Sequence, residues 1–175
     1  MIRNEDAPPY LPTEADPRST SDSADDATIE KALAILERRL KGHSDRLSYA
    51  PVMGSPADVK KYLTLLLSEE TIEKFVALFL DAQHRLINVE VLATGTIDQA
   101  VVYPREVAKV ALARDVSAVI FAHNHPSGSA TPSRADITLT GALKAALALF
   151  NIRVIDHIIV PRGSACVSMA ETGQL

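Results

Sequence analysis

Apolar residues recur at helical spacing in two early stretches of the chain. In the first, the spacings are four, three and four, at Ile29, Leu33, Leu36 and Leu40. This pattern predicts an amphipathic helix that ends near Gly42. In the second, Ser55 stands at a capping position and Pro56 at the first helical position, so a further helix is predicted as far as about Leu67. Residues 43–54 are predicted to connect the two helices.

The rest of the chain alternates short apolar runs with turn residues. The continuous apolar run 75–80 is bounded by Lys74 and by turn residues, which is typical of a buried strand. The same reasoning predicts strands over 85–94, 99–103, 117–123, 153–160 and 165–168, and helices over 104–114 and 133–150. Strands and helices in this order predict an α/β or α+β domain with a mostly antiparallel or mixed sheet.

The N-terminal segment has a different composition. Residues 1–27 hold four prolines, several serines and few large apolar side chains, so we expect an acidic, proline-rich disordered tail. Residues 28–50 are then expected to form the amphipathic helix and a linker, and residues 51–175 the folded domain. The apolar stripe of residues 29–40 fits docking onto that domain, and it leaves a homodimer through this helix open.

Composition excludes several classes of protein. Hydrophobic residues make up 47% of the chain and charged residues 23%, as in an average globular protein. With Cys166 as the only cysteine, neither an internal disulfide nor a multi-cysteine zinc cluster can form. The apolar runs are much shorter than the ~20 residues of a membrane helix. The N-terminus lacks the basic start and apolar stretch of a signal peptide, so we expect a cytoplasmic protein that does not enter a membrane.

The charge is distributed unevenly. Residues 1–27 carry two basic and seven acidic side chains, whereas residues 28–175 carry 16 basic and 15 acidic ones. Nucleic-acid binding usually requires a concentrated patch of lysine and arginine. The near-neutral domain therefore gives only weak support to DNA as a partner.

The segment 123–136 carries the candidate chemistry. His123 and His125 are two apart at the end of a predicted buried strand, so both imidazoles can point to one place. Ser133 and Asp136 stand at the cap and third position of the following helix, where they can form a capping box. Two imidazoles and one carboxylate could hold a catalytic metal, because they leave a coordination position open. Taken singly, each of these residues also has a structural explanation, as a core histidine, a loop residue or a cap.

This spacing resembles that of a known family. The order His-x-His-Pro, six residues, Ser-x-x-Asp is similar to the JAMM motif of JAB/MPN metalloproteins. Flanking segments, Tyr103–Val107 and Asp156–Val160, resemble the RadC-like branch. The resemblance covers about residues 55–172 and implies a cytidine-deaminase-like α/β sandwich, a mixed sheet flanked by helices.

The resemblance also implies roles for the motif residues. His123, His125 and Asp136 would bind one Zn²⁺ per chain, and Ser133 would help to stabilise an oxyanion. The zinc-activated water would be the nucleophile. In the wider family a glutamate at the start of an early strand, in a Glu-x-x-Gly-x-Leu pattern, acts as general base.

In this chain Glu73 stands at the place of that glutamate, with Val76 where many relatives have glycine. Three other acids compete for the role: Glu69, Glu70 and Glu106. Of these, Glu106 could also support the site from the helix that begins at Pro104.

Other metal enzymes fit less well. A zinc nucleobase deaminase needs a His-x-Glu and a Pro-Cys-x-x-Cys motif, which a chain with one cysteine cannot supply. The His-Glu-x-x-His helix of many metalloproteases is absent. A two-histidine, one-carboxylate iron oxygenase shares the ligand types, but the serine and proline spacing favours zinc. His157 interrupts an apolar strand and is expected to be a hydrogen-bonded core histidine rather than a fourth ligand.

The sequence therefore favours a zinc-dependent hydrolase that cleaves peptide or isopeptide bonds in a peptide or a protein conjugate. The alternative is a DNA-repair or mobile-element factor that binds or cleaves DNA. Longer RadC-like relatives carry a helix-hairpin-helix segment associated with DNA binding. Here a tail and one amphipathic helix are predicted instead, which weakens the alternative.

Overall fold

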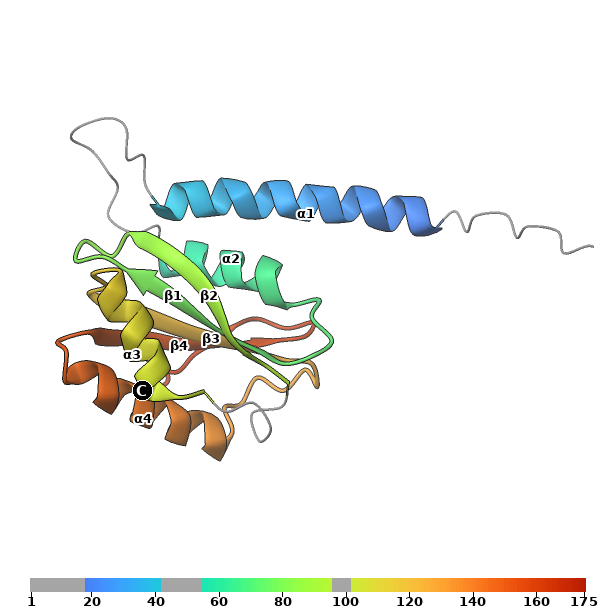
Figure 1. Cartoon of the computed structure of the whole chain (residues 1–175). Coiled ribbons are helices and arrows are strands. Elements are labelled where there is room, and N and C mark those ends of the chain that lie inside the picture. The colour runs from blue at the N-terminus through green and yellow to red at the C-terminus, as the bar shows by residue number, and fades with distance from the viewer. Residues whose placement is uncertain (1–17, 42–54, 96–101) are drawn as a thin grey trace, which may run out of the picture.

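The computed structural model describes residues 18–41, 55–95 and 102–175 (Figure 1). These residues form four helices and five strands. In chain order they are α1 (Arg18–Lys41), α2 (Pro56–Leu67), β1 (Lys74–Leu80), β2 (Leu86–Thr94), α3 (Pro104–Ala113), β3 (Ala118–His125), α4 (Arg134–Ala148), β4 (Arg153–Pro161) and β5 (Val167–Ser168).

The strands form one mixed sheet in the order β2-β1-β3-β4-β5. Neighbouring strands are antiparallel except for β3 and β4, which are parallel and are joined by the crossover helix α4. A parallel pair requires such a crossover, because the chain must return to the same end of the sheet. The expected α/β fold with a mixed sheet flanked by helices is confirmed.

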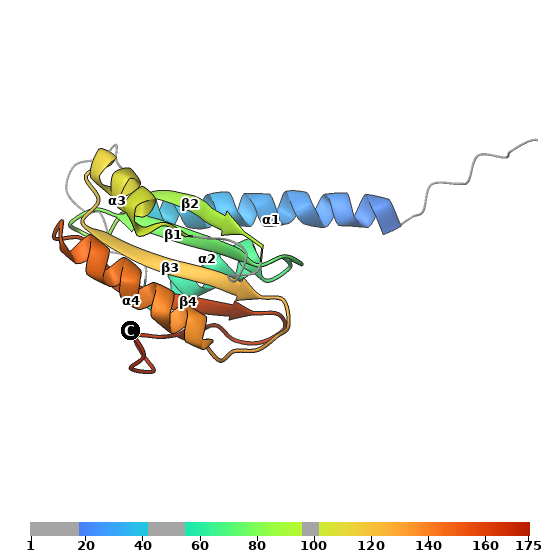
Figure 2. The same cartoon turned by 60° about the horizontal axis from the view of Figure 1, so that its bottom comes forward.

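Helices cover both faces of this sheet. Figure 2 shows α3 and α4 on one face, whereas α2 lies behind the strands with α1 beyond it. Side chains along β1 and β3 alternate between the two layers: Leu78 and Ile120 face α2, whereas Phe79 and Phe121 face α3 and α4. Because every second residue of a strand faces the same side, strands buried on both faces must be apolar throughout. This explains the unbroken apolar runs in the sequence.

Helix α1 is attached to the domain through α2. Leu33 and Leu36 pack against the core on the α2 face, and the hydroxyl of the buried Tyr62 donates a hydrogen bond to Glu37 Oε1 at 3.0 Å. Burial and the neighbouring carboxylate raise the pKa of Tyr62 above its ordinary value. The predicted docking of the apolar stripe is therefore observed for these two leucines, while the N-terminal part of α1 extends past the sheet (Figures 1 and 2).

The first helix begins earlier than its hydrophobic pattern predicted. It starts at Arg18 rather than Thr28, so residues 18–27 of the expected disordered tail are helical. Pro17 is the last proline before α1, and no proline or glycine follows until Gly42. Once nucleated, a helix extends at little cost through such a segment.

No helix in the described part of the chain is long and apolar enough to cross a membrane.

Most other elements agree with the prediction to within two residues. Strand β3 continues to His125 rather than ending at His123. Ser55 precedes α2 as expected, but its hydroxyl contacts Asp58 Oδ2 and makes no side-chain bond to the helix backbone. Residues 99–101 of the expected strand 99–103 lie outside the described residues, and its last two residues are not in a strand.

Two glycines near α4 provide a matched test of this backbone. Gly128 has φ +79°, and an added Cβ would lie 3.3 Å from the Arg162 carbonyl oxygen, whereas Gly141 is in the helix with open space around it. We expect Gly128→Ala to lower the free energy of unfolding by about 1–3 kcal/mol. Gly141→Ala should raise it by up to about 1 kcal/mol. Urea denaturation of both variants measures the difference, and equal effects would contradict the turn geometry.

Candidate metal centre

The end of strand β3 brings two histidines together. His123 and His125 lie on the face that α3 and α4 cover, and their Nε2 atoms are 2.8 Å apart. His123 is fully buried and His125 is partly buried. The side chain of Asn124 points to the opposite layer, where it bonds main-chain atoms of residues 70–74. The geometry expected from strand alternation is confirmed.

Helix α4 adds a carboxylate to this pair. Asp136, at the third position of the helix, accepts a hydrogen bond from the Ser133 N–H through Oδ2 at 2.6 Å, and its own N–H donates to Ser133 Oγ at 3.1 Å. This is a complete capping box. The carboxylate also lies beside the histidines, with Oδ1 3.3 Å from His123 Nε2 and Oδ2 3.6 Å from His125 Nε2. Capping and membership of the centre are therefore compatible.

The three side chains bring two imidazole nitrogens and one carboxylate oxygen to one point. Asp136 Oδ1 is buried and accepts no hydrogen bond within the described structure. His125 Nδ1 lies 2.7 Å from the Ser129 carbonyl oxygen, which can only accept, so Nδ1 carries a hydrogen and Nε2 carries the lone pair when the ring is neutral. Burial of such atoms without a partner is costly. A cation would satisfy them all.

The donor set fits a small divalent ion. Two nitrogen ligands at 2.0–2.1 Å in tetrahedral geometry are about 3.3 Å apart. The observed separations of 2.8, 3.3 and 3.6 Å lie around this value. Imidazole nitrogens with one carboxylate oxygen are common zinc ligands, although they also serve other transition metals. The centre could hold a metal ion, and its donor types are those of zinc and of related transition metals.

Electrostatics favour the ionised carboxylate. Burial by itself would raise the pKa of Asp136, but the imidazoles of His123 and His125 outweigh burial and hold this pKa below its ordinary value. The same carboxylate raises the pKa of His125, against the opposing effect of burial. The centre thus attracts positive charge, which a proton or a metal ion can supply.

Glu73, just before β1, is the fourth residue of the group that could hold a metal. One carboxylate oxygen of Glu73 lies within 4.8 Å of the ligand atoms of His123, His125 and Asp136. The residue immediately precedes β1, and its carbonyl oxygen accepts a hydrogen bond from the Gly95 N–H at 2.8 Å. The antiparallel register pairs Phe75 with His123, which brings the start of β1 to the end of β3.

The competing acids lie elsewhere. Glu106 is exposed on α3, where its carboxylate bonds Lys109 and Arg105, so the suggestion that it supports the site is wrong. The Glu70 carboxylate bonds Lys74 Nζ at 2.6 Å, and Glu69 is exposed. Among these acids only Glu73 belongs to the group that could hold a metal.

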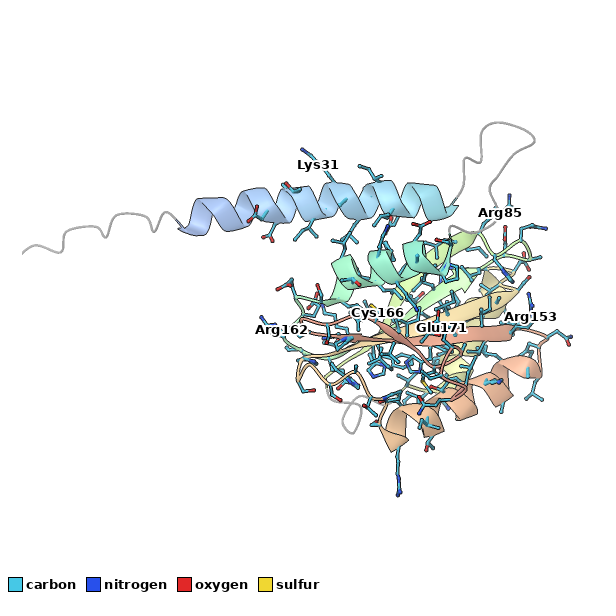
Figure 3. All side chains as sticks on the ribbon, turned by 180° about the vertical axis from the view of Figure 1, so that it is seen from behind. Lys31, Arg85, Arg153, Arg162, Cys166 and Glu171 are labelled. Carbon is cyan, nitrogen blue, oxygen red and sulfur yellow. The ribbon has the colours of Figure 1, made fainter. Side chains whose placement is uncertain are left out.

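The centre lies at one end of the parallel strand pair. Figure 3 shows Arg153 and Arg162, which flank the two ends of β4, at opposite ends of the sheet. The Arg162 N–H donates to the His125 carbonyl oxygen at 3.2 Å, so the centre is at the Arg162 end. Ser133 is exposed at the start of α4 at this same end, and its N–H and hydroxyl hold Asp136.

Three buried polar residues for which the sequence indicated no role at the centre contact its residues or the segments that hold them. His157, expected as a core histidine, lies with Nε2 2.8 Å from His123 Nδ1, and Thr140 contacts its other nitrogen. Burial lowers the pKa of His157 to about 3, so its ring is neutral. Asn124 is the third. A threonine four residues after Asp136, on the same helix face, is a signal that could have indicated Thr140.

Comparisons with known proteins agree with the expected family. Residues 53–174 match the family model described as RadC-like JAB domain. The chain is 56% identical over 142 residues to a UPF0758 protein of Methylibium petroleiphilum, covering 81% of this chain and 64% of that protein. It is 49% identical over 150 residues to a UPF0758 protein of Variovorax paradoxus, covering 86% and 66%. The matches thus span slightly less than two thirds of these relatives.

The Asn124 contacts generate a test of how Glu73 is held. Asn124 Oδ1 accepts from the Lys74 N–H at 2.7 Å, and its Nδ2 donates to the carbonyl oxygens of Glu70 and Ile72. Asn124→Asp keeps the acceptor but places a second oxygen against the two carbonyls. We expect it to lower the free energy of unfolding by about 1–3 kcal/mol, because buried polar groups lose their partners. Chemical denaturation measures this loss, and hydrogen exchange at the Lys74 amide should rise. Wild-type behaviour in both measurements would show that the clamp has no effect.

Proposed function

Because the chain belongs to the RadC-like JAB domain family, we propose that it is a metal-dependent hydrolase whose centre consists of His123, His125 and Asp136. The proposed metal is zinc, with one ion bound per chain. It is carried by one observation: the Nε2 atoms of two imidazoles and a buried carboxylate oxygen without a hydrogen bond converge on one point. Three protein ligands leave a coordination position open for chemistry, unlike the four ligands of a structural zinc site.

Bound zinc would supply Lewis acidity, which lowers the pKa of water and polarises a carbonyl group. The protein's own residues would do the rest. Glu73, next to the ligand atoms, would accept a proton from the attacking water and deliver it to the leaving amine. Such general acid–base catalysis contributes roughly 10²–10⁴-fold in rate. The Ser133 hydroxyl, at the exposed start of α4, would donate a hydrogen bond to the developing oxyanion.

The proposed substrate is a peptide or an isopeptide bond in a protein conjugate. Support comes from the ligand set and from the adjacent carboxylate, which amide hydrolysis needs to protonate a poor leaving group. Cleavage of a phosphodiester remains the competing reaction, since the same activation of water could serve it. The near-neutral charge of residues 28–175 does not favour a nucleic-acid substrate.

Metal content is the first test. Protein purified without chelator should contain about one zinc per chain by elemental analysis. Asp136→Asn keeps an oxygen for the Ser133 N–H but removes the negative charge. Substitution of a residue that only supports a ligand lowers metal affinity ~10–100-fold, so the zinc affinity of this variant should fall by more than that. The matched control Asp58→Asn lies in the first turn of α2 and should keep the metal. Equal metal content in both variants would refute the centre.

Kinetics of Glu73→Gln separate a general base from a fourth ligand. If Glu73 is the general base, Glu73→Gln should leave the metal content unchanged and lower kcat roughly 10²–10⁴-fold. Loss of the metal together with activity would instead make Glu73 a ligand. Glu106→Gln, at an exposed carboxylate on α3, should match wild type. The substrates are a peptide library, isopeptide-linked conjugates and a phosphodiester. Turnover of the phosphodiester alone, lost in Glu73→Gln, would replace the peptidase assignment with a nuclease.

A further inference from the structure

A buried chain of hydrogen bonds runs behind the metal centre. It begins at the carbonyl oxygen of Asp136, which lies 2.6 Å from Thr140 Oγ1. Thr140 Oγ1 lies 2.5 Å from His157 Nδ1, and His157 Nε2 lies 2.8 Å from His123 Nδ1. His123 and His157 are fully buried and Thr140 is 2% exposed, so water does not supply alternative partners. This series of hydrogen bonds links the main chain of Asp136 to the side chain of His123.

The first atom of this chain fixes the direction of every hydrogen in it. A carbonyl oxygen can only accept, so the Thr140 hydroxyl donates to Asp136. The hydroxyl has one hydrogen, so Oγ1 must accept from His157 Nδ1. A neutral imidazole carries one ring hydrogen, which leaves His157 Nε2 as an acceptor. His123 Nδ1 therefore donates to it, and in the neutral ring the Nε2 of His123 carries the lone pair.

From this geometry we propose that Thr140 and His157 are positioning residues that hold His123 in the one tautomer able to bind a metal through Nε2. The proposal rests on the proposed function for its purpose, but the hydrogen-bond order exists without a metal. Which ring nitrogen of a histidine ligand is free depends on the hydrogen bond that the other nitrogen makes. His125 uses a backbone carbonyl for this purpose, whereas His123 uses a second histidine.

The surroundings of His157 keep its ring in place. The Phe75 ring meets it edge-on at 5.2 Å between centroids, and the Phe121 ring does so at 6.3 Å. The main chain is also held, since the His157 N–H donates to Asp156 Oδ1 at 2.7 Å and its carbonyl oxygen accepts from Met169 at 2.9 Å. Both ring nitrogens of His157 are also hydrogen-bonded, so a flip that exchanged them would break two buried hydrogen bonds. Its tautomer then depends on the acceptor that Thr140 provides.

Thr140→Val is the decisive variant, because valine has the shape of threonine but no hydroxyl. Without an acceptor at Nδ1, the hydrogen of His157 should move to Nε2, which forces the hydrogen of His123 onto its own Nε2. Thr140→Ser keeps the hydroxyl and should behave as wild type. Thr138→Val is the matched control: the Thr138 hydroxyl makes the same bond four residues back, to the Arg134 carbonyl oxygen at 2.8 Å, on the exposed face of α4.

Two readouts are needed. Long-range ¹H–¹⁵N NMR spectra of the metal-free protein report which nitrogen of each imidazole carries hydrogen. Competition with a chromophoric chelator reports zinc affinity. We expect Thr140→Val to change the tautomers of His157 and His123 and to weaken zinc binding about 10–100-fold. Thr140→Ser and Thr138→Val should leave both readouts unchanged.

The outcomes distinguish this inference from the proposed function. Wild-type tautomers and zinc affinity in Thr140→Val would overturn the inference while the metal centre stands. A wild-type protein that takes up no zinc would overturn the proposed function, yet the tautomers in the metal-free spectra would still decide the positioning role. If Thr140→Val fails to fold, Thr140→Ala removes the same hydroxyl without adding volume and is judged by the same two readouts.

Discussion

The constraint on which this structure depends is the convergence of two imidazole nitrogens and one carboxylate oxygen between the end of β3 and the start of α4. His123, His125 and Asp136 each direct an acceptor there, and their remaining polar atoms are occupied by other partners. Asp136 Oδ1 is buried there without a hydrogen bond, and a buried acceptor without a donor costs free energy. The surrounding fold maintains an arrangement that only a proton or a cation can relieve. Stability is thus reduced at the place where chemistry is proposed.

Strand β3 serves both faces of the sheet at this end. The histidines project toward α4, and Asn124 between them projects toward the opposite layer. There it replaces strand pairing for the segment that leads into β1, with Glu73 immediately before the strand. The alternating side-chain directions of β3 therefore position both parts of the candidate centre: the two histidines directly, and Glu73 through the main chain that Asn124 holds. A substitution at Asn124 would act on Glu73 without touching a ligand atom.

The crossover from β3 through α4 to β4 explains how one centre draws on three elements. The first turn of α4 forms the capping box. One oxygen of Asp136 accepts a hydrogen bond from the Ser133 N–H, and the other faces His123. One turn further along α4, Thr140 reaches the adjacent parallel strand and contacts His157. The same helix thus carries Asp136, a proposed ligand, and Thr140, which contacts the histidine behind the proposed ligand His123. Membership of the family follows from the sequence match over residues 53–174. The contacts of Thr140 and His157 behind the centre become visible only in the three-dimensional structure.

The sequence by itself determined the α/β class, the order of most elements, and the strand-turn-helix motif with its two histidines and aspartate. These features depend on strand alternation and helix capping, which act over a few neighbouring residues. The early start of α1 escaped prediction because helix extension needs no apolar pattern. Tertiary structure alone decided that Glu73 joins the centre and Glu106 does not, since the register of β1 against β3 brings only the former there. It also decided the contact of Thr140 with His157, because the pairing of distant segments depends on sheet order and packing, which local patterns do not encode.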